Sequence, residues 1–254
     1  GKRILVTGGG SGLGAAMGHR FVELGAELII CGRRLELLET TAARMRSELS
    51  GKVGVVGCDI RDGAAVDAMM EEIWREAPID VLVNNAAATF IAQTEHLSFR
   101  AADAILAPTL HGAMYCTLAA GKRWIEGEHK GVVLSILSTS TITGRAFTVP
   151  SSMAKSAVLA MTRSLAVEWG PKGVRMVAIA PGGRRSYDSD EWRGALIVVE
   201  QGELELECLS GHRHCFPRGG VLWLAGLPLR ALHNKGYEPA LLAAVSRSRP
   251  MSST

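Results

Sequence analysis

A run of glycines close to the amino terminus, Gly8-Gly9-Gly10-Ser11-Gly12-Leu13-Gly14, constrains the fold of this chain more than any other feature. It follows the apolar run at residues 3–7 and precedes an apolar stretch that starts near Ala15. Glycine lets a backbone turn sharply and approach a ligand closely, because it carries no Cβ. The free N–H groups at the start of the next helix then suit a pyrophosphate. A strand, a glycine turn and a helix in this order therefore predict a dinucleotide-binding loop rather than a turn without a ligand.

Short apolar runs and longer amphipathic stretches alternate along residues 3–180, which is typical of βαβ units on a parallel sheet. We expect strands at residues 3–7, 27–32, 52–57, 79–83, 131–137 and 174–180. Between them, residues 35–49 and 151–168 have apolar positions at helical spacing. With right-handed crossovers, this pattern predicts the α/β class and a doubly wound parallel sheet of the Rossmann type.

The end of the second expected strand indicates which dinucleotide the loop binds. Residues 27–31 lead into Gly32-Arg33-Arg34, where an NAD-selective fold places a carboxylate for the ribose hydroxyls. A guanidinium matches a 2′-phosphate in charge and geometry, so Arg33 and Arg34 favour NADP(H) over NAD(H). The alternative is a solvated arginine pair at the start of a helix.

Two further segments follow expected strands at the same edge of the sheet. Cys58-Asp59-Ile60 ends the third strand, where the edge of an adenine ring could be met. Asn84-Asn85-Ala86-Ala87 ends the fourth strand, and its small side chains would let a cofactor lie close to the backbone.

Together, the Thr-Gly-x3-Gly-x-Gly pattern at 7–14, Asp59, Asn84-Asn85-Ala86 and Pro181-Gly182 resemble the short-chain dehydrogenase/reductase family over residues 1–183. Within that family, the Asn-Asn-Ala-Ala run and the segments 148–155 and 164–170 look most like 2,4-dienoyl-CoA reductases. The resemblance implies an NADPH-dependent reduction of an unsaturated acyl-CoA thioester by a homo-oligomer. The expected cofactor-binding residues are Thr7, Gly8, Gly10, Ser11, Gly12, Leu13, Gly14, Arg33, Arg34, Asp59, Ile60, Asn85, Ala86, Lys155, Pro181 and Gly182.

The same resemblance implies the catalytic residues. The usual family pattern has a tyrosine four residues before a lysine, and here Lys155 is present with Ser151 at the tyrosine position. Dienoyl-CoA reductases share that serine and use a second tyrosine and an asparagine, which fall by register at Ser140 and Thr89. Hydride transfer to a conjugated thioester needs donors at the carbonyl oxygen, where enolate charge develops. We expect Ser151 to donate there, and Lys155 to bind the ribose hydroxyls and add positive potential. The further candidate donors are Ser138, Ser140 and Thr89.

The source of the final proton and the activity itself stay open at this point. A serine hydroxyl is a poor acid, so the proton would come from water or from His111. Pro108 lacks a backbone donor and should kink or break the helix expected around it, which bears on the geometry of the site. An active NADPH-dependent reductase is the first reading. A carbonyl reductase of the same family and a nucleotide-binding sensor or scaffold with little turnover are the alternatives.

Composition changes after Pro181-Gly182-Gly183, where residues 184–190 have the character of a polar linker. We therefore expect a nucleotide-binding domain at 1–183 and a small β-rich appendage at 184–254. Strands are expected at 195–200, 203–209 and 221–225, the first two joined by a tight hairpin at Gln201-Gly202. Through the segments 202–206, 216–219, 232–236 and 238–240, residues 192–247 look like the later half of a small cupin barrel. Half a barrel would leave open strand edges.

Composition and spacing argue against several other partners. His212 and His214 lack a nearby partner histidine, so we predict no metal site. The formal charge is only +3 and the basic residues are scattered, which disfavours nucleic acid. Five cysteines without paired spacing indicate reduced thiols and a cytoplasmic location. We expect no membrane span and no signal peptide, because no apolar run approaches the ~20 residues that a bilayer requires.

Overall fold

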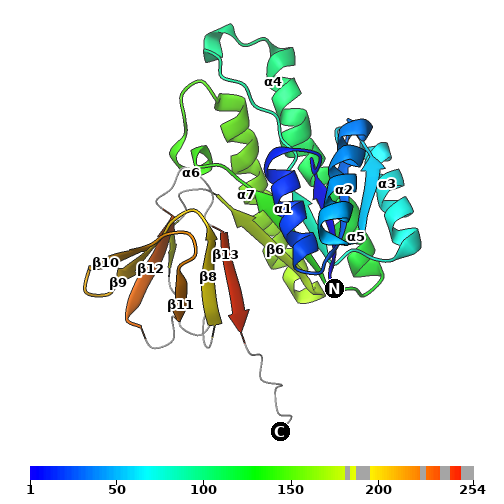
Figure 1. Cartoon of the computed structure of the whole chain (residues 1–254). Coiled ribbons are helices and arrows are strands. Elements are labelled where there is room, and N and C mark those ends of the chain that lie inside the picture. The colour runs from blue at the N-terminus through cyan, green and yellow to red at the C-terminus, as the bar shows by residue number, and fades with distance from the viewer. Residues whose placement is uncertain (181–183, 187–194, 224–226, 235–240, 247–254) are drawn as a thin grey trace. The chain divides into compact units, whose positions relative to one another are not determined.

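The computed structural model describes residues 1–180, 184–186, 195–223, 227–234 and 241–246. Two compact units follow one another along the chain, Gly1–Ile179 and Ala180–Thr254 (Figure 1). The expected domain boundary after Gly183 remains a prediction, because residues 181–183 lie outside the described part.

The first unit is built on a six-stranded parallel sheet with the strand order β3-β2-β1-β4-β5-β6. The strands are β1 (Arg3–Thr7), β2 (Glu27–Gly32), β3 (Val53–Gly57), β4 (Val81–Asn84), β5 (Gly131–Ile136) and β6 (Val174–Ile179). Successive crossovers lead away from β1 in one direction and from β4 in the other, which opens a crevice outside their carboxyl ends. This arrangement confirms the doubly wound sheet, and each predicted strand end lies within two residues of the observed one.

Helices cover both faces of this sheet (Figure 1). They are α1 (Gly12–Glu23), α2 (Leu35–Leu49), α3 (Gly63–Glu76), α4 (Phe99–Leu106), α5 (Gly112–Glu126), α6 (Ser140–Thr143) and α7 (Val149–Trp169), with short 3-10 turns at Thr94–His96 and Gly170–Lys172. Helices α1 and α2 pack with the sheet in one apolar core, and α3, α5 and α7 in the other. Trp124 anchors the second core, because its ring is fully buried and Nε1 donates to the Ile79 carbonyl at 2.6 Å.

A π-helical segment, Ala107–His111, separates α4 from α5. Pro108 has no N–H, so the carbonyl four residues before it loses its α-helical partner. A π-turn pairs a carbonyl with the amide five residues further on, which bypasses the missing donor. The structure therefore confirms that Pro108 interrupts the regular helix, and it shows that the chain continues through the interruption as a helix.

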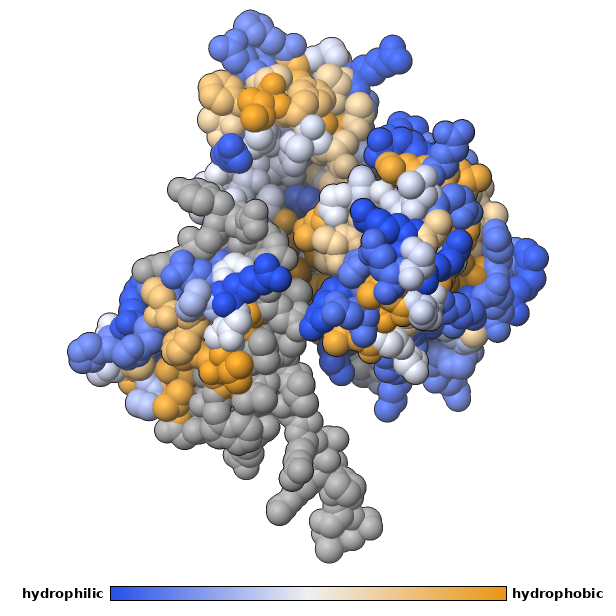
Figure 2. All heavy atoms as spheres, in the orientation of Figure 1, coloured by the Kyte–Doolittle hydropathy of each residue, from blue (hydrophilic) through white to orange (hydrophobic). Residues whose placement is uncertain are grey.

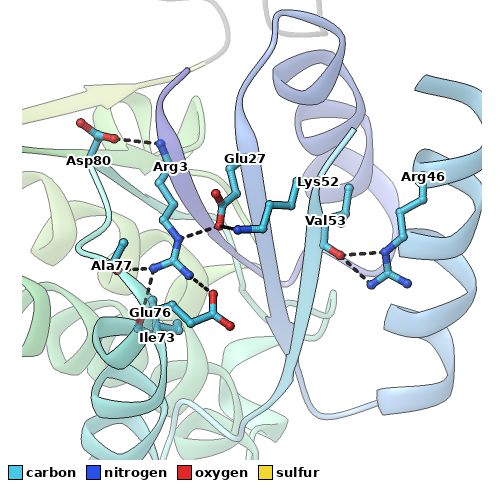
Figure 3. A network of polar contacts seen from close by, with 9 residues as sticks. All are labelled: Arg3, Glu27, Arg46, Lys52, Val53, Ile73, Glu76, Ala77 and Asp80. Atoms are coloured by element: carbon cyan, nitrogen blue, oxygen red, sulfur yellow. Dashed lines mark hydrogen bonds and ion pairs between the residues drawn. The ribbon is translucent and has the colours of Figure 1, made fainter. Parts of the chain in front are cut away.

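Ionic and backbone contacts fasten the amino ends of the strands, at the edge opposite the glycine loop (Figure 3). The Arg3 side chain is only 8% exposed, and its guanidinium binds two side chains and two carbonyls. Its partners are Glu27, Glu76, Ile73 O and Ala77 O. Asp80 accepts from the Arg3 backbone N–H at 2.8 Å, and Arg46 donates twice to the Val53 carbonyl. The Arg3 contacts join β1, β2 and the end of α3, and the Arg46 contacts join α2 to β3.

The second unit contains two antiparallel sheets with the orders β10-β9-β12-β7 and β11-β8-β13. The strands are β7 (Arg184–Ser186), β8 (Ala195–Gln201), β9 (Leu204–Cys208), β10 (Arg213–Phe216), β11 (Val221–Trp223), β12 (Leu229–Asn234) and β13 (Leu241–Ser246). A small apolar core includes Val199, Leu204, Leu206 and Leu222. This unit agrees with the expected small β-rich appendage, while its likeness to a cupin barrel stays a prediction.

Two details of the expected appendage are wrong. Strands β8 and β9 do not form a hairpin at Gln201-Gly202, because they belong to different sheets. Gly202 has φ +76°, which suits a corner between two sheets as well as it suits a tight hairpin turn. The prediction of a polar linker is also wrong for residues 184–186, because these residues form a strand that pairs with β12. The expected strand at 221–225 is observed as Val221–Trp223, and its last two residues lie outside the described part.

Candidate functional site

The glycine loop turns tightly between β1 and α1. Gly8 has φ +68° and Gly12 has φ +54°, a region that residues with a Cβ rarely adopt. At Gly14, a Cβ would lie 2.4 Å from the Gly8 carbonyl oxygen and 2.6 Å from Asn85 Nδ2. The loop is therefore compact enough only with glycine at these positions, and it presents the first turn of α1 to the crevice.

Hydrogen bonds between Thr7 and the end of β4 fix the two sides of the crevice. The buried Thr7 hydroxyl accepts from the backbone N–H groups of Asn85 and Ala86, each at 3.0 Å, and donates to the Val83 carbonyl at 3.2 Å. Asn85 Nδ2 returns a bond to the Thr7 carbonyl at 2.9 Å. Thr7 therefore lies beneath the site and supports its walls.

A cavity lies over this loop and the carboxyl ends of β2, β3 and β4. It brings together most of the residues expected at the cofactor, namely Gly8, Gly10, Ser11, Leu13, Gly14, Arg33, Arg34, Asp59, Ile60, Asn85 and Ala86. Cys58 and Ala87, which belong to the segments expected beside the cofactor, also line it. Its remaining lining residues were not predicted as site residues: Cys31, Gly32, Leu37, Leu38, Ala88 and Pro108. Gly12, Thr7 and Lys155 do not line it, and Pro181 and Gly182 lie outside the described residues.

Two guanidinium groups line this cavity at the carboxyl end of β2. Arg33 and Arg34 are exposed at the end of β2 and line the cavity at the start of α2. Asp59 accepts from Arg61 through both carboxylate oxygens, with distances of 2.5 to 3.0 Å. The Arg61 guanidinium, with help from Arg33, holds the pKa of the Asp59 carboxyl below its usual range. Arg61 itself does not line the cavity, and its pairing with Asp59 was not predicted from the sequence.

Three of the expected catalytic hydroxyls lie after β5 and at the start of α7. Ser138 Oγ is 2.8 Å from Ser140 Oγ and 3.4 Å from Thr141 Oγ1, so these hydroxyls bond to one another. Ser140 is buried at the first residue of α6. Ser151 is half-buried in the first turn of α7, four residues before Lys155 and therefore on the same face of that helix.

Lys155 is buried, with 7% of its surface exposed. Its Nζ donates to the Ile136 carbonyl at 2.6 Å, which places the ammonium group at the carboxyl end of β5. Burial lowers the pKa of Lys155 to about 8, because the charged form loses its hydration. A single carbonyl leaves two of the three ammonium protons available to a ligand.

Thr89, an expected hydrogen-bond donor, and His111, a candidate proton source, do not line the cavity. Thr89 is exposed on the loop after β4 and does not line the cavity, which ends at Ala88 on that loop. His111 is exposed and stacks on Tyr115, with ring centroids 6.2 Å apart, and does not line the cavity either. Tyr115 is the single tyrosine in the part of the chain that the structure describes, and it lies on α5.

Neither a metal-binding cluster nor a membrane-spanning helix occurs among the described residues. Among those residues, no cluster of three or more histidine, cysteine or acidic side chains could bind a metal ion. None of the helices in the described ranges combines the length and the apolar character needed to cross a bilayer.

Comparison with known proteins agrees with the geometry. The family model for short chain dehydrogenase matches residues 2–193. A protein of Bacillus subtilis (strain 168), named as a probable 2,4-dienoyl-CoA reductase, is 39% identical over 71% of this chain and 72% of its own length. A Caenorhabditis elegans protein, named as a probable 2,4-dienoyl-CoA reductase 3, is 40% identical over 72% of this chain. This chain spans only 60% of that relative's length.

Solved structures show the same likeness. A short chain dehydrogenase from Bacillus anthracis is 39% identical, with a TM-score of 0.68 over 71% of this chain and 76% of its own. An NAD(P) dependent relative from Beutenbergia cavernae, solved with bound NADP, is 29% identical, with a TM-score of 0.67 over 71% and 72% of the two chains. With the sheet order, the glycine loop and these matches in agreement, the chain belongs to the short-chain dehydrogenase family, and within it is most like the 2,4-dienoyl-CoA reductases.

Proposed function

We propose that this oxidoreductase binds NADP(H) in preference to NAD(H) and reduces an unsaturated acyl-CoA thioester. A nicotinamide cofactor is general to the family, whereas the preference for the 2′-phosphate is inferred from this chain's own residues. The observation that carries the proposal is the pair Arg33 and Arg34 at the end of β2, where they line the cavity beside the glycine loop.

The residues of the crevice fit a dinucleotide. The close approach of Gly14 to Gly8 leaves no room for a side chain, so the backbone N–H groups at the start of α1 are accessible to a diphosphate. No carboxylate stands at the end of β2 to compete for ribose hydroxyls, since Gly32 is followed by two arginines. Arg33 can bind a 2′-phosphate in the bidentate manner that a lysine cannot match. The Beutenbergia cavernae relative with bound NADP supports this choice.

When bound, the cofactor supplies the hydride, and the chain's own groups prepare the substrate to receive it. The Ser151 hydroxyl donates to the thioester carbonyl oxygen, where negative charge develops. The Ser138–Ser140 pair, with a 2.8 Å oxygen separation, supplies a second donor from the segment after β5. Lys155 uses one proton on the Ile136 carbonyl and directs the others to the ribose hydroxyls. Its charge also lowers the energy of an enolate nearby.

The names of the relatives suggest the substrate class. The Bacillus subtilis and Caenorhabditis elegans relatives are named as dienoyl-CoA reductases, and both are about as similar to this chain as the solved Bacillus anthracis protein. Ser151 replaces the usual family tyrosine in a way that this group of reductases shares. We therefore assign a conjugated acyl thioester as the substrate, rather than a simple ketone.

A nucleotide-binding protein with little turnover is the second candidate. It is favoured by Ser151 and Ser140 at the two positions where tyrosines are expected, and by Tyr115, which does not line the cavity. An unassisted serine hydroxyl is a weak acid, and His111 stacks on Tyr115 outside the cavity, so water is the remaining proton donor. Under this alternative, NADPH binds but is not consumed.

A turnover assay with matched variants tests the proposal. NADPH oxidation is measured with dienoyl-CoA, enoyl-CoA and ketone substrates, for the natural chain and for Arg33→Asp. We expect oxidation with the dienoyl thioester, and a fall of roughly ten- to a hundredfold in NADPH affinity for Arg33→Asp, because one charge-assisted contact is lost. Arg44→Asp, an exposed change on the same helix α2, is the control and should leave affinity unchanged. Binding of NADPH without oxidation of any substrate would favour the second candidate.

A further inference from the structure

An acidic side chain, Asp59, lines the cofactor cavity together with the arginines at the end of β2. Asp59 follows β3 and Arg33 follows β2, and these two strands are neighbours in the sheet. The Cys58 N–H donates to the Gly32 carbonyl at 2.9 Å, so the residues that come next, Asp59 and Arg33, leave the sheet side by side. Arg61 first, and the charge of Arg33 as well, lower the pKa of the Asp59 carboxyl. Asp59 is therefore a carboxylate that lies within electrostatic reach of Arg33.

A carboxylate at this place opposes the binding of a 2′-phosphate in two ways. A phosphate monoester carries close to two negative charges at neutral pH, and like charges a few ångströms apart repel each other. A carboxylate without a cation of its own can also pair with Arg33 and compete with the phosphate for that guanidinium. In the part of the chain that the structure describes, however, Asp59 has an ion pair with Arg61 and none with Arg33.

Arg61 holds the Asp59 carboxylate through both of its oxygens. Arg61 Nε donates to the two oxygens at 2.9 Å and 3.0 Å, and Nη2 donates to one of them at 2.5 Å. The Arg61 backbone N–H donates to the same carboxylate at 3.1 Å. A guanidinium that contacts both oxygens fixes the orientation of a carboxylate as well as neutralising it. Because Arg61 does not line the cavity, it does this from outside the space that a ligand would occupy.

The Asp59–Arg61 pair lies at a solvated surface, because 34% of the Asp59 side chain and 43% of the Arg61 side chain are exposed. Figure 2 shows mostly hydrophilic residues on the side of the first unit where Figure 1 places α2 and α3, the helices that follow β2 and β3. Charges at such a surface interact through a high dielectric constant and are screened by salt. The effect of this pair on a nearby phosphate should therefore be modest, and it should decrease as the ionic strength rises.

We propose that Arg61 is a positioning residue for cofactor choice: it neutralises Asp59, and this leaves Arg33 available to the 2′-phosphate of NADP(H). The proposal rests on the proposed preference for NADP(H), and it adds a residue outside the cavity that helps to determine that preference. NAD(H) has a hydroxyl where NADP(H) has the phosphate, so an unpaired Asp59 would weaken the binding of NADP(H) selectively. The ratio of the two affinities therefore reports on Arg61, whereas a general loss of structure would weaken both.

Equilibrium titrations with NADPH and NADH measure this ratio in the natural chain and in its variants. In Arg61→Met, we expect the ratio of NADPH affinity to NADH affinity to fall roughly three- to tenfold at low salt, and by less at high salt. Arg61→Lys keeps a cation beside the carboxylate and should retain most of the ratio. Arg20→Met is the matched control, because it removes the same charge and an ion pair with Glu23 near the end of α1 that is far from the glycine loop. It should leave the ratio unchanged.

A second substitution shows whether Arg61 acts through Asp59. Asp59→Asn removes the negative charge and keeps the shape of the side chain. If Arg61 acts by neutralising this acid, adding Asp59→Asn to Arg61→Met should restore the ratio to the value of Asp59→Asn alone. Any contact between residue 59 and the adenine ring is common to NADPH and NADH, so it cancels in the ratio.

The other outcomes overturn the proposal. An unchanged ratio in Arg61→Met means that Asp59 does not oppose the phosphate, and a ratio that Asp59→Asn does not restore means that Arg61 acts without Asp59. A loss in Arg61→Lys as large as in Arg61→Met contradicts a role through charge. If the natural chain binds NADPH and NADH equally, the proposed preference fails. The ratio must then still fall in Arg61→Met, and a constant ratio overturns the role of Arg61 separately. If neither nucleotide binds, both proposals fail.

Discussion

The buried ammonium of Lys155 makes the stability of the protein depend on pH in a specific way. Burial lowers the pKa of this lysine from 10.5 to about 8. Between those values the unfolded chain binds more protons than the folded chain, so the free energy of unfolding rises as pH rises through this window. A pKa difference of one corresponds to about 1.4 kcal/mol, so Lys155 contributes a rise of about 3 kcal/mol. Below pH 8 its destabilising effect is fully present.

Replacing this lysine isolates the effect. In Lys155→Met, the part of the rise in unfolding free energy that comes from Lys155 should disappear. The variant also loses the hydrogen bond to the Ile136 carbonyl, which lowers its stability equally at pH 7 and at pH 10. The measurement is urea unfolding at pH 7 and pH 10, for the natural chain and the variant. Taking the difference between the two proteins cancels the other groups that titrate in this range.

Lys122→Met is the matched control for this experiment. Lys122 is 71% exposed beside Glu126, so its loss should leave the pH dependence of unfolding as it is in the natural chain. If Lys155→Met and the natural chain gain equal stability between pH 7 and pH 10, the ammonium group is not buried as described and the reasoning is refuted.

Two substitutions test the geometry of the first unit. Gly14→Ala should weaken NADPH binding and lower the free energy of unfolding by about 1 to 3 kcal/mol, because the added Cβ would lie 2.4 Å from the Gly8 carbonyl oxygen. Gly170→Ala is the control. Its Cβ would enter open space, so neither cofactor binding nor stability should fall. Thermal unfolding and a cofactor titration check both changes. Arg3→Met should lower the free energy of unfolding by about 3 kcal/mol, because it leaves partly buried acceptors without their cation. Lys2→Met removes only a surface ion pair and should lower the free energy of unfolding by less than about 1 kcal/mol. Equal losses in urea unfolding for these two neighbours would contradict the contacts in Figure 3.

The first unit was predictable because its local pattern and its tertiary packing agree. Helix α2 is observed at the predicted residues, Leu35–Leu49, and helix α7 begins two residues before the predicted start. Strands buried on both faces must be apolar throughout, so β1, β2 and β5 stand out from the amphipathic helices between them. The place of the cavity could be predicted in the same way, because its walls include loops at the carboxyl ends of parallel strands.

Strand pairing in the second unit and the placement of some site residues depend on tertiary contacts, which the spacing of residues along the sequence does not reveal. Gly202 permits a hairpin and a corner between sheets equally, so the pairing of β8 with β11 and β13 was not visible in the sequence. Likewise, the register that aligned Thr89 with a family asparagine could not show that its side chain is exposed. Pro108 was expected to disturb a helix, yet only the structure shows that it also lines the cavity.

The preference for the 2′-phosphate can be measured from the relative affinity of the purified protein for NADPH and NADH. Equilibrium titration of each nucleotide, followed by protein fluorescence, needs neither a substrate nor a variant. We expect NADPH to bind roughly ten- to a hundredfold more tightly than NADH, because Arg33 and Arg34 would bind the 2′-phosphate through charge-assisted contacts. Equal affinity, a preference for NADH, or no binding of either nucleotide would contradict it.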